Sequence, residues 1–288
     1  MRSPDTRLAV FGRQVRSQRS PGSIADRIPV DALRAIPAVA TPERVGIAVA
    51  VMMGGLAVEV VWTAHRRLPA LDEIDASGAV GDLRGSPIRL VALGDSTLTA
   101  PGVADRSGVW LHQALVRLDP PRRVEVISLA VSGSRIADVA ERLDEAIGLD
   151  PDLVVLAVGS NDAVHATPAQ RFEARLDEVL RRLLAAAPVV AVANIGDLGN
   201  VARVRPPLDT VLRLRSRALC RRVERVVASH ERAVLLDVTE TNEAFRDPNV
   251  FAADLFHPTE AGHSIWAQAA LPGLRIAFDR LPSSADSP

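Results

Sequence analysis

From residue 88 onward, short apolar runs alternate with longer stretches in which apolar residues recur every three or four positions. The short runs have strand length and are almost continuously apolar, which is typical of strands buried on both faces of a parallel sheet. They cover residues 88–93, 124–129, 153–158, 189–193 and 233–236. The longer stretches predict helices at 108–118, 136–147, 169–187, 208–229 and 259–278. This alternation predicts a three-layer α/β/α domain with a five-stranded parallel sheet and right-handed crossovers.

A different pattern occupies residues 45–64, which are nearly all apolar apart from Glu59. Their length is close to the ~20 residues that cross a bilayer, whereas the uncharged part is as short as a core helix. The missing polar face and the Arg-rich upstream flank favour a membrane anchor. A soluble packing helix and a cleaved targeting segment remain alternatives. The pattern therefore favours a membrane-anchored location in the cell envelope over a cytoplasmic one.

These patterns predict five regions along the chain. Residues 1–44 are rich in Arg, Ser and Pro without an apolar period, which predicts a flexible tail. An apolar helix at 45–67 and a polar linker at 68–87 follow, and the linker leads into a catalytic domain at 88–282. Residues 283–288 are expected to form a disordered tail.

Composition excludes several classes of function. With 34 basic and 35 acidic residues among 288, the formal charge is -1, which argues against a nucleic-acid partner. Aromatic residues make up 3% of the chain, too few to suggest a platform for stacking bases. Cys220 is the single cysteine, so neither an internal disulfide nor a Cys-rich zinc site can form.

Polar residues follow several of the predicted strands. Ser96 follows the first strand, Gly133 comes shortly after the second, and Asn161 follows the third. Asp254 and His257 come a short distance after the fifth strand, just before the last predicted helix. Because chemistry gathers at the carboxyl ends of the strands in such sheets, we expect these residues to meet at one edge.

The residues expected at this edge have side chains that are suited to nucleophilic catalysis on an acyl group. A serine hydroxyl needs a base to remove its proton, and that base needs a third group to fix its tautomer. The spacing of Asp254 and His257 suits orienter and base, although the pair alone is also explained by a helix cap and a loop histidine. The backbone amides of Ser96 and Gly133 and the side-chain amide of Asn161 are candidates for an oxyanion hole. Asp95 and Asp162 are expected to support the site by holding loop amides.

Four blocks together carry a resemblance. They are Gly-Asp-Ser-Thr at 94–97, Ser-Gly-Ser at 132–134, Gly-Ser-Asn-Asp at 159–162 and Asp-Leu-Phe-His-Pro at 254–258. In this order on a βα pattern they resemble the SGNH hydrolase superfamily, the GDSL-type esterases and lipases, over residues 88–279. The resemblance implies a flavodoxin-like SGNH fold, Ser96 as nucleophile and oxyanion donor, Gly133 and Asn161 as further donors, and Asp254 with His257 as the rest of the triad. A looser similarity, in the run Gly-Asp-Leu-Gly at 196–199 and in the overall layout, is to actinobacterial members with an N-terminal membrane segment.

Two positions depart from the superfamily pattern. Thr97 stands where Leu is usual, and the second block lacks the Asn often found ahead of its glycine, so Gly133 is the least secure assignment. A metallophosphoesterase is a rival, but the Asp-x-His that it needs at the first strand is missing. A binding module that has lost turnover is a second rival, against which the complete triad argues.

The sequence thus predicts a serine esterase that needs no cofactor or metal and acts on a lipid, an acylated sugar or a small acyl ester. An acyltransferase or a carbohydrate deacetylase with the same residues is the alternative. The walls of the substrate pocket are expected to include residues 196–207. Trp110 and Trp266 are expected to fill the core, with lining of an acyl pocket as the alternative. The sequence does not indicate an oligomeric state.

Overall fold

The computed structural model describes residues 42–81 and 87–282. The predicted tails at 1–41 and 283–288, and residues 82–86 of the predicted linker, lie outside the described residues. The strands are β1 (Gly78–Val80), β2 (Ile88–Gly94), β3 (Val124–Ser128), β4 (Leu153–Ala157), β5 (Val189–Ala193) and β6 (Ala233–Leu236). The helices are α1 (Pro42–His65), α2 (Ser96–Thr99), α3 (Trp110–Leu118), α4 (Ile136–Glu141), α5 (Leu143–Gly148), α6 (Ser160–Val164), α7 (Ala169–Ala186), α8 (Leu208–Ala228) and α9 (Glu260–Asp279).

The sheet has six strands in the order β1-β3-β2-β4-β5-β6, so the predicted five-stranded, all-parallel sheet is wrong in one detail. The five predicted strands are present and parallel, and β1 adds an antiparallel edge on β3. β1 lies inside the predicted linker. Its three residues are too few to show a hydrophobic period, and its pairing partner is more than forty residues away in the sequence, for example Ala79 opposite Glu125.

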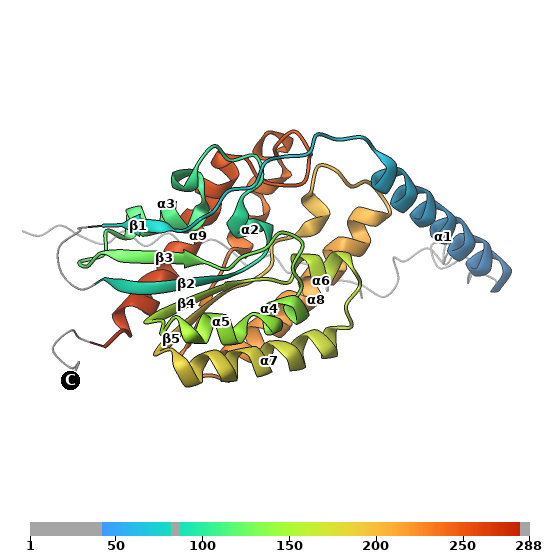
Figure 1. The fold of residues 1–288 in the computed structure, drawn as a ribbon. Helices are drawn as coiled ribbons and strands as arrows, with labels where there is room; N and C mark the ends of the chain where they lie inside the picture. Colours follow the sequence, from blue (N-terminus) through green and yellow to red (C-terminus); the bar gives the residue numbers. More distant parts are fainter. Residues whose placement is uncertain (1–41, 82–86, 283–288) are drawn as a thin grey trace, which may run out of the picture. The chain divides into compact units, whose positions relative to one another are not determined.

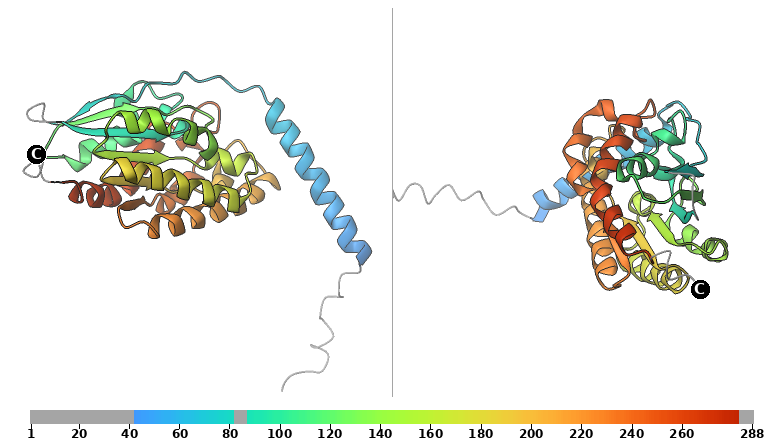
Figure 2. Two further views of the ribbon diagram at one scale, coloured as in Figure 1. Left: turned by 60° about the horizontal axis from the view of Figure 1, so that its bottom comes forward. Right: turned by 90° about the vertical axis from the view of Figure 1, so that its left-hand side faces the viewer.

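Helices cover both faces of this sheet, as the alternating pattern predicted. Figures 1 and 2 show α4, α5 and α7 on one face and α3 and α9 on the other. Alternate residues of each strand enter different cores: Leu90 packs toward α3 and α9, whereas Val91 packs toward α4 and α7. Strands buried on both faces explain why their sequences are continuously apolar.

The helices follow the predicted amphipathic periods, with one difference. The predicted helix at 136–147 is divided into α4 and α5 at Arg142. The last helix, predicted at 259–278, runs from Glu260 to Asp279, and Thr259 caps it by accepting a hydrogen bond from the Gly262 amide at 3.4 Å. The loop that carries His257 is therefore separate from α9.

The order of the five parallel strands places the site. Counted along the chain, these strands lie in the order second, first, third, fourth, fifth, which is the flavodoxin-like arrangement. The connections leave in opposite directions from the first and third of them, β2 and β4, and this divergence opens a crevice at their carboxyl ends. Ser96 is the first residue of α2, which follows β2, and Asn161 is the second residue of α6, which follows β4.

Helix α1 includes one span, Val45–Thr63, that is long and apolar enough to cross a bilayer, with a mean hydropathy of 2.1. The side chains from Val45 to Val51 are exposed. Glu59, the charged residue in the span, accepts hydrogen bonds from the Thr63 hydroxyl at 3.3 Å and from the Arg205 amide at 3.0 Å. These two donors offset part of the cost of placing a carboxylate in an apolar segment.

Candidate active site

A tight turn after β2 presents Ser96. Gly94, the last residue of β2, is required before this turn because a Cβ there would lie 2.1 Å from the carbonyl oxygen of Ala157 on β4. Asp95 then caps α2 by accepting a hydrogen bond from the Thr97 amide at 3.0 Å. Ser96 is the first residue of that helix and is 8% exposed. In the described part of the chain its amide has no acceptor, so the amide is free to bind a ligand.

Asp254 and His257 are paired in a loop before α9. The Nδ1 atom of His257 lies 2.6 Å from Oδ2 of Asp254, and Oδ1 of Asp254 accepts from the amides of Phe256 and His257 at 3.0 Å each. Burial opposes ionisation of this carboxyl, but the hydrogen bonds from His257 and the two amides lower the pKa of Asp254. Asp254 does not cap the last helix, which removes the simpler explanation of the pair.

Backbone hydrogen bonds fix the conformation of the loop that carries Asp254 and His257. The Ala252 amide donates to the His257 carbonyl at 2.7 Å, and Phe251 and Pro258 form an isolated antiparallel bridge. Leu255, at the tip, has a φ of 60° in the left-handed region, where non-glycine residues are uncommon. This turn lets one carboxylate reach both the imidazole and the two amides.

Gly133 and Asn161 lie at the ends of neighbouring strands. Gly133 has a φ of 78°, nothing lies within 4 Å of the position of a Cβ, and no described residue accepts a hydrogen bond from its amide. The side-chain amide of Asn161 donates to Oδ2 of Asp95 at 3.3 Å and to the Ser134 carbonyl at 3.2 Å. Both contacts are long, so they orient the amide while leaving it able to turn toward a stronger acceptor.

Two buried carboxyls connect these loops. Burial raises the pKa of Asp95 to about 6, against the hydrogen bonds from Thr97 that lower it. Asp162 accepts a hydrogen bond from the Ile136 amide at 2.9 Å, which ties the loop after β4 to the start of α4, and burial raises its pKa as well. Both side chains hold the loops that carry Ser96, Gly133 and Asn161.

The predicted residues line two cavities that share Ser96, Phe256 and His257. Ser96 and His257 both line an aromatic pocket, and both also line a wider groove together with Gly133, Asn161 and Asp254. No hydrogen bond joins the Ser96 hydroxyl to His257 in the described part of the structure. Catalytic hydrogen bonds are often long until substrate binds. The shared cavities show that Ser96 and His257 border the same space even without such a bond.

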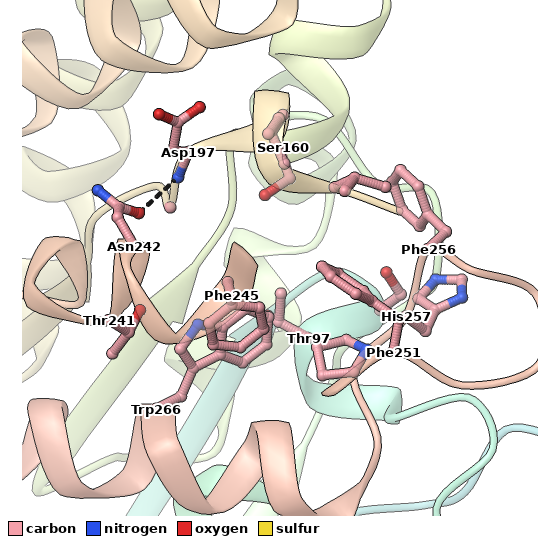
Figure 3. Close-up of a pocket in the computed structure, with 15 residues that line it drawn as sticks. Thr97, Ser160, Asp197, Thr241, Asn242, Phe245, Phe251, Phe256, His257 and Trp266 are labelled. Carbon is pink, nitrogen blue, oxygen red and sulfur yellow. Dashed lines mark hydrogen bonds between the residues drawn. The ribbon is translucent and has the colours of Figure 1, made fainter. Parts of the chain in front are cut away.

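Ser96 is one of the residues that line the aromatic pocket, and Figure 3 shows how the aromatic side chains lie around this space. The chain has 6 Phe, 3 Trp and no Tyr, and four of these aromatic residues line this one pocket: Phe245, Phe251, Phe256 and Trp266. Phe245 and Trp266 are stacked with ring centroids 5.2 Å apart. Trp266 thus lines the pocket rather than only filling the core, whereas Trp110 is buried. Sequence reasoning missed the three phenylalanines, although all of them lie within twelve residues of His257.

The opposite end of the pocket is formed by the loop after β5, as expected for residues 196–207. Figure 3 shows Asp197 and Asn242 there, with the Asp197 amide donating to Oδ1 of Asn242 at 2.8 Å. The Asp197 side chain, 2% exposed, pairs with Arg213 at 2.8 Å and Arg217 at 3.2 Å. These two arginines of α8 thereby hold the pocket wall in place. Leu198 contributes to that wall.

Metal ligands are not grouped in this part of the chain: within residues 42–81 and 87–282, no three His, Cys, Asp or Glu side chains are placed to hold an ion.

A serine at the switch point of a doubly wound sheet, with an aspartate-oriented imidazole on the same cavities, defines the class of SGNH-type hydrolase folds. The sequence pattern of the GDSL-like lipase/acylhydrolase family matches residues 92–265, and the chain belongs to this family. The chain is also similar to the GDSL-like esterase Rv1075c of Mycobacterium tuberculosis (strain ATCC 25618 / H37Rv), with 27% identity over 198 residues. That match covers 66% of this chain and 63% of the relative's length.

Solved structures agree on the fold. An acetylxylan esterase from Geobacillus stearothermophilus, Axe2, solved as a catalytic mutant, has a TM-score of 0.54 and 21% identity, over 69% of this chain and 99% of its own. An α/β hydrolase enzyme from the metagenome of Lake Arreo, Spain, LAE5, has a TM-score of 0.53 and 23% identity, over 68% of this chain and 96% of its own. At this identity the likeness concerns the fold.

Proposed function

We propose that the protein is a serine esterase that hydrolyses carboxylic esters through an acyl-enzyme on Ser96. The observation that carries the proposal is the 2.6 Å contact between His257 Nδ1 and Asp254 Oδ2, in a loop whose imidazole lines the same cavities as Ser96. With Nδ1 donating to the carboxylate, Nε2 is the unprotonated nitrogen of the neutral ring, which is the state that a general base requires.

The reaction then follows from these groups. Ser96 Oγ attacks the ester carbonyl while its proton passes to Nε2 of His257. Collapse of the tetrahedral intermediate breaks the bond to the alcohol, which leaves with the proton from Nε2. Water next attacks the acyl-enzyme, giving its proton to Nε2, and the second collapse releases the acid and returns the proton to Ser96. Asp254 stays ionised and stabilises the imidazolium in both halves.

The negative charge that develops on the carbonyl oxygen needs donors that are already in place. The amides of Ser96 and Gly133 supply two, because no described residue accepts from either of them. Asn161 supplies the third when its side-chain amide gives up the 3.2 Å contact to Ser134 or the 3.3 Å contact to Asp95. Loss of one such donor typically slows the reaction ~10² to 10³-fold.

The aromatic pocket favours a short, apolar acyl group. Its volume is about 60 Å³, and since one water needs roughly 10 to 15 Å³, the space corresponds to a short hydrocarbon chain. We expect short acyl groups to be preferred over long fatty acyl chains, which this space does not accommodate. Transfer of the acyl group to a second alcohol uses the same residues, and product analysis with added alcohol distinguishes transferase from hydrolase.

Hydrolysis of p-nitrophenyl butyrate tests the proposal. Ser96→Ala and His257→Ala are each expected to lose ~10⁴-fold or more of the rate. His230→Ala is a matched control, because His230 pairs with Asp177 at 2.8 Å and lines none of the cavities around Ser96. Rates near the wild-type value in Ser96→Ala would refute the mechanism, as would equal losses in the two histidine variants.

We also propose that α1 attaches the protein to a membrane. The support is the 19-residue span at Val45–Thr63, which as a helix is about as long as the ~30 Å hydrocarbon core, and the two arginines that follow it at 66 and 67. Fractionation of cells that produce the full chain, with a variant carrying Val51→Arg and Val58→Arg in the exposed face, tests this. The full chain should sediment with membranes and the variant should not.

A further inference from the structure

The wider groove beside Ser96 contains an unusual pair of cations. This groove, which we call the arginine groove, has a volume of about 660 Å³. Besides the catalytic candidates it is lined by Arg66, Leu71, Arg203, Val204 and Leu208. Because Ser96 also lines this groove, an ester that reacts at Ser96 can place its acyl part in the aromatic pocket and its alcohol part in the groove, or the reverse.

Both guanidinium groups lie partly buried and lack an anionic partner. Nη2 of Arg203 donates to the Thr63 carbonyl at 3.0 Å, but its Nε is buried with no acceptor. The guanidinium of Arg66 lies 4.9 Å from the ring centroid of Trp62, and its Nη1 is also buried with no acceptor. Neither arginine has a carboxylate within 4.0 Å in the part of the chain that the structure describes.

The carboxylates that line the groove do not compensate these charges. Asp254 is engaged by His257 and two amides. Glu73 is exposed and forms no ion pair among the described residues. The contrast with α8 is informative, because Arg213 and Arg222 there each have an acidic partner. A partly buried cation with no carboxylate beside it is costly unless a ligand supplies the counter-charge.

We propose that the arginine groove binds an anionic group on the alcohol side of the ester, so that the substrate is an acyl ester of a phosphorylated or carboxylated alcohol. This inference rests on the proposed esterase function and names its substrate class. Guanidinium groups bind phosphate and carboxylate through two parallel hydrogen bonds, which gives direction as well as charge. The short acyl chain occupies the aromatic pocket, and the charged alcohol occupies the groove from which it leaves.

A pair of esters that differ only in charge tests the proposal. The full chain in a non-ionic detergent is assayed with 1-hexanoylglycerol 3-phosphate and with 1-hexanoylglycerol, by release of hexanoate. The wild-type kcat/KM for the phosphate ester is expected to exceed that for the neutral ester by about tenfold or more. Arg203→Gln and Arg66→Gln should each bring the ratio toward one while leaving the neutral ester within about twofold of wild type.

Two further variants separate charge from structure. Arg203→Lys retains the cation and should keep part of the preference. Arg205→Gln is the matched control, because Arg205 is exposed on the same loop and does not line the groove, and it should leave the ratio unchanged. The proposal is overturned if the wild-type kcat/KM values for the phosphate ester and the neutral ester are about equal. It is also overturned if Arg203→Gln slows the hydrolysis of both esters by the same factor and Arg66→Gln changes neither rate.

Binding without turnover keeps this result separate from the esterase proposal. Calorimetry with the Ser96→Ala protein should show binding of 1-hexanoylglycerol 3-phosphate about tenfold tighter than binding of 1-hexanoylglycerol. Equal binding rejects the anion site even if p-nitrophenyl esters are cleaved through Ser96. Selective binding with no Ser96-dependent cleavage of any ester instead rejects the esterase proposal and retains the anion site. Because both glycerol esters are water-soluble, a preference found without lipid belongs to the groove and not to lipid headgroups.

Discussion

Replacing Asp254 by Asn tests the orientation of His257 with little change in shape. Asp254 accepts three hydrogen bonds: one from the imidazole at 2.6 Å and two from backbone amides at 3.0 Å. An Asn can keep its oxygen on the two amides, but its NH₂ group then faces Nδ1 of His257. The ring must accept at Nδ1 and carry its proton on Nε2, which leaves no base for Ser96.

The expected magnitude follows from losing the base while keeping the oxyanion donors. We expect kcat for p-nitrophenyl butyrate to fall ~10⁴-fold, equivalent to about 5.5 kcal/mol of transition-state stabilisation. Folding should suffer much less, by under about 2 kcal/mol, because the amides keep an acceptor. Asp254→Ala leaves both amides without that acceptor and should unfold at lower denaturant concentration than Asp254→Asn.

The assay measures steady-state rates beside urea unfolding of the same preparations. A rate for Asp254→Asn within about tenfold of wild type would refute the tautomer argument, because His257 would then act as a base without a carboxylate to hold its proton on Nδ1. A large loss of stability in the same variant would mean that the activity loss reports unfolding.

Three further predictions concern the scaffold. Gly94→Ala should destabilise the protein by more than about 3 kcal/mol in urea unfolding, since its Cβ would lie 2.1 Å from the Ala157 carbonyl oxygen, and near-normal stability would refute the close approach. Asp197→Asn should lower the free energy of unfolding by about 1 to 2 kcal/mol and raise KM, because it leaves two partly exposed arginines without their shared carboxylate at the pocket wall; an unchanged KM would show that this wall does not contact substrate. Burial lowers the pKa of His263 to about 4, so between about pH 4 and 6.5 the unfolded chain binds more protons and stability rises with pH. His263→Asn, which can still accept from the Trp110 amide, should therefore lose about 1.5 kcal/mol less stability than wild type between pH 6.5 and 5, and identical pH profiles would contradict this.

Much of the fold could be predicted because burial on both faces gives the strands a continuous apolar signature. The five parallel strands match the predicted ranges within one residue, whereas β1 escaped notice because its three residues depend on pairing with β3. The break at Arg142 escaped for a similar reason, since the apolar period continues across it and only the backbone changes direction.

The meeting of the predicted site residues could be predicted, because the carboxyl ends of parallel strands lie at one edge of the sheet. The paired contact of Asp254 with His257 was predictable from their spacing. The aromatic pocket was not, because Phe245, Phe251 and Trp266 come from different segments and meet only in the folded chain. The lack of a hydrogen-bond acceptor for Nε of Arg203 depends equally on which side chains surround it. Such properties belong to the assembled surface and leave no local pattern.

Covalent labelling of the active serine tests directly whether Ser96 is the nucleophile that His257 activates. The full chain is treated with an alkyl fluorophosphonate, and the adduct is located by mass spectrometry of peptides from wild type, His257→Ala and the control His230→Ala. We expect one adduct on Ser96, formed at the same rate in the control and about 10³-fold or more slowly in His257→Ala. An adduct on another residue, or a rate that does not depend on His257, would contradict it.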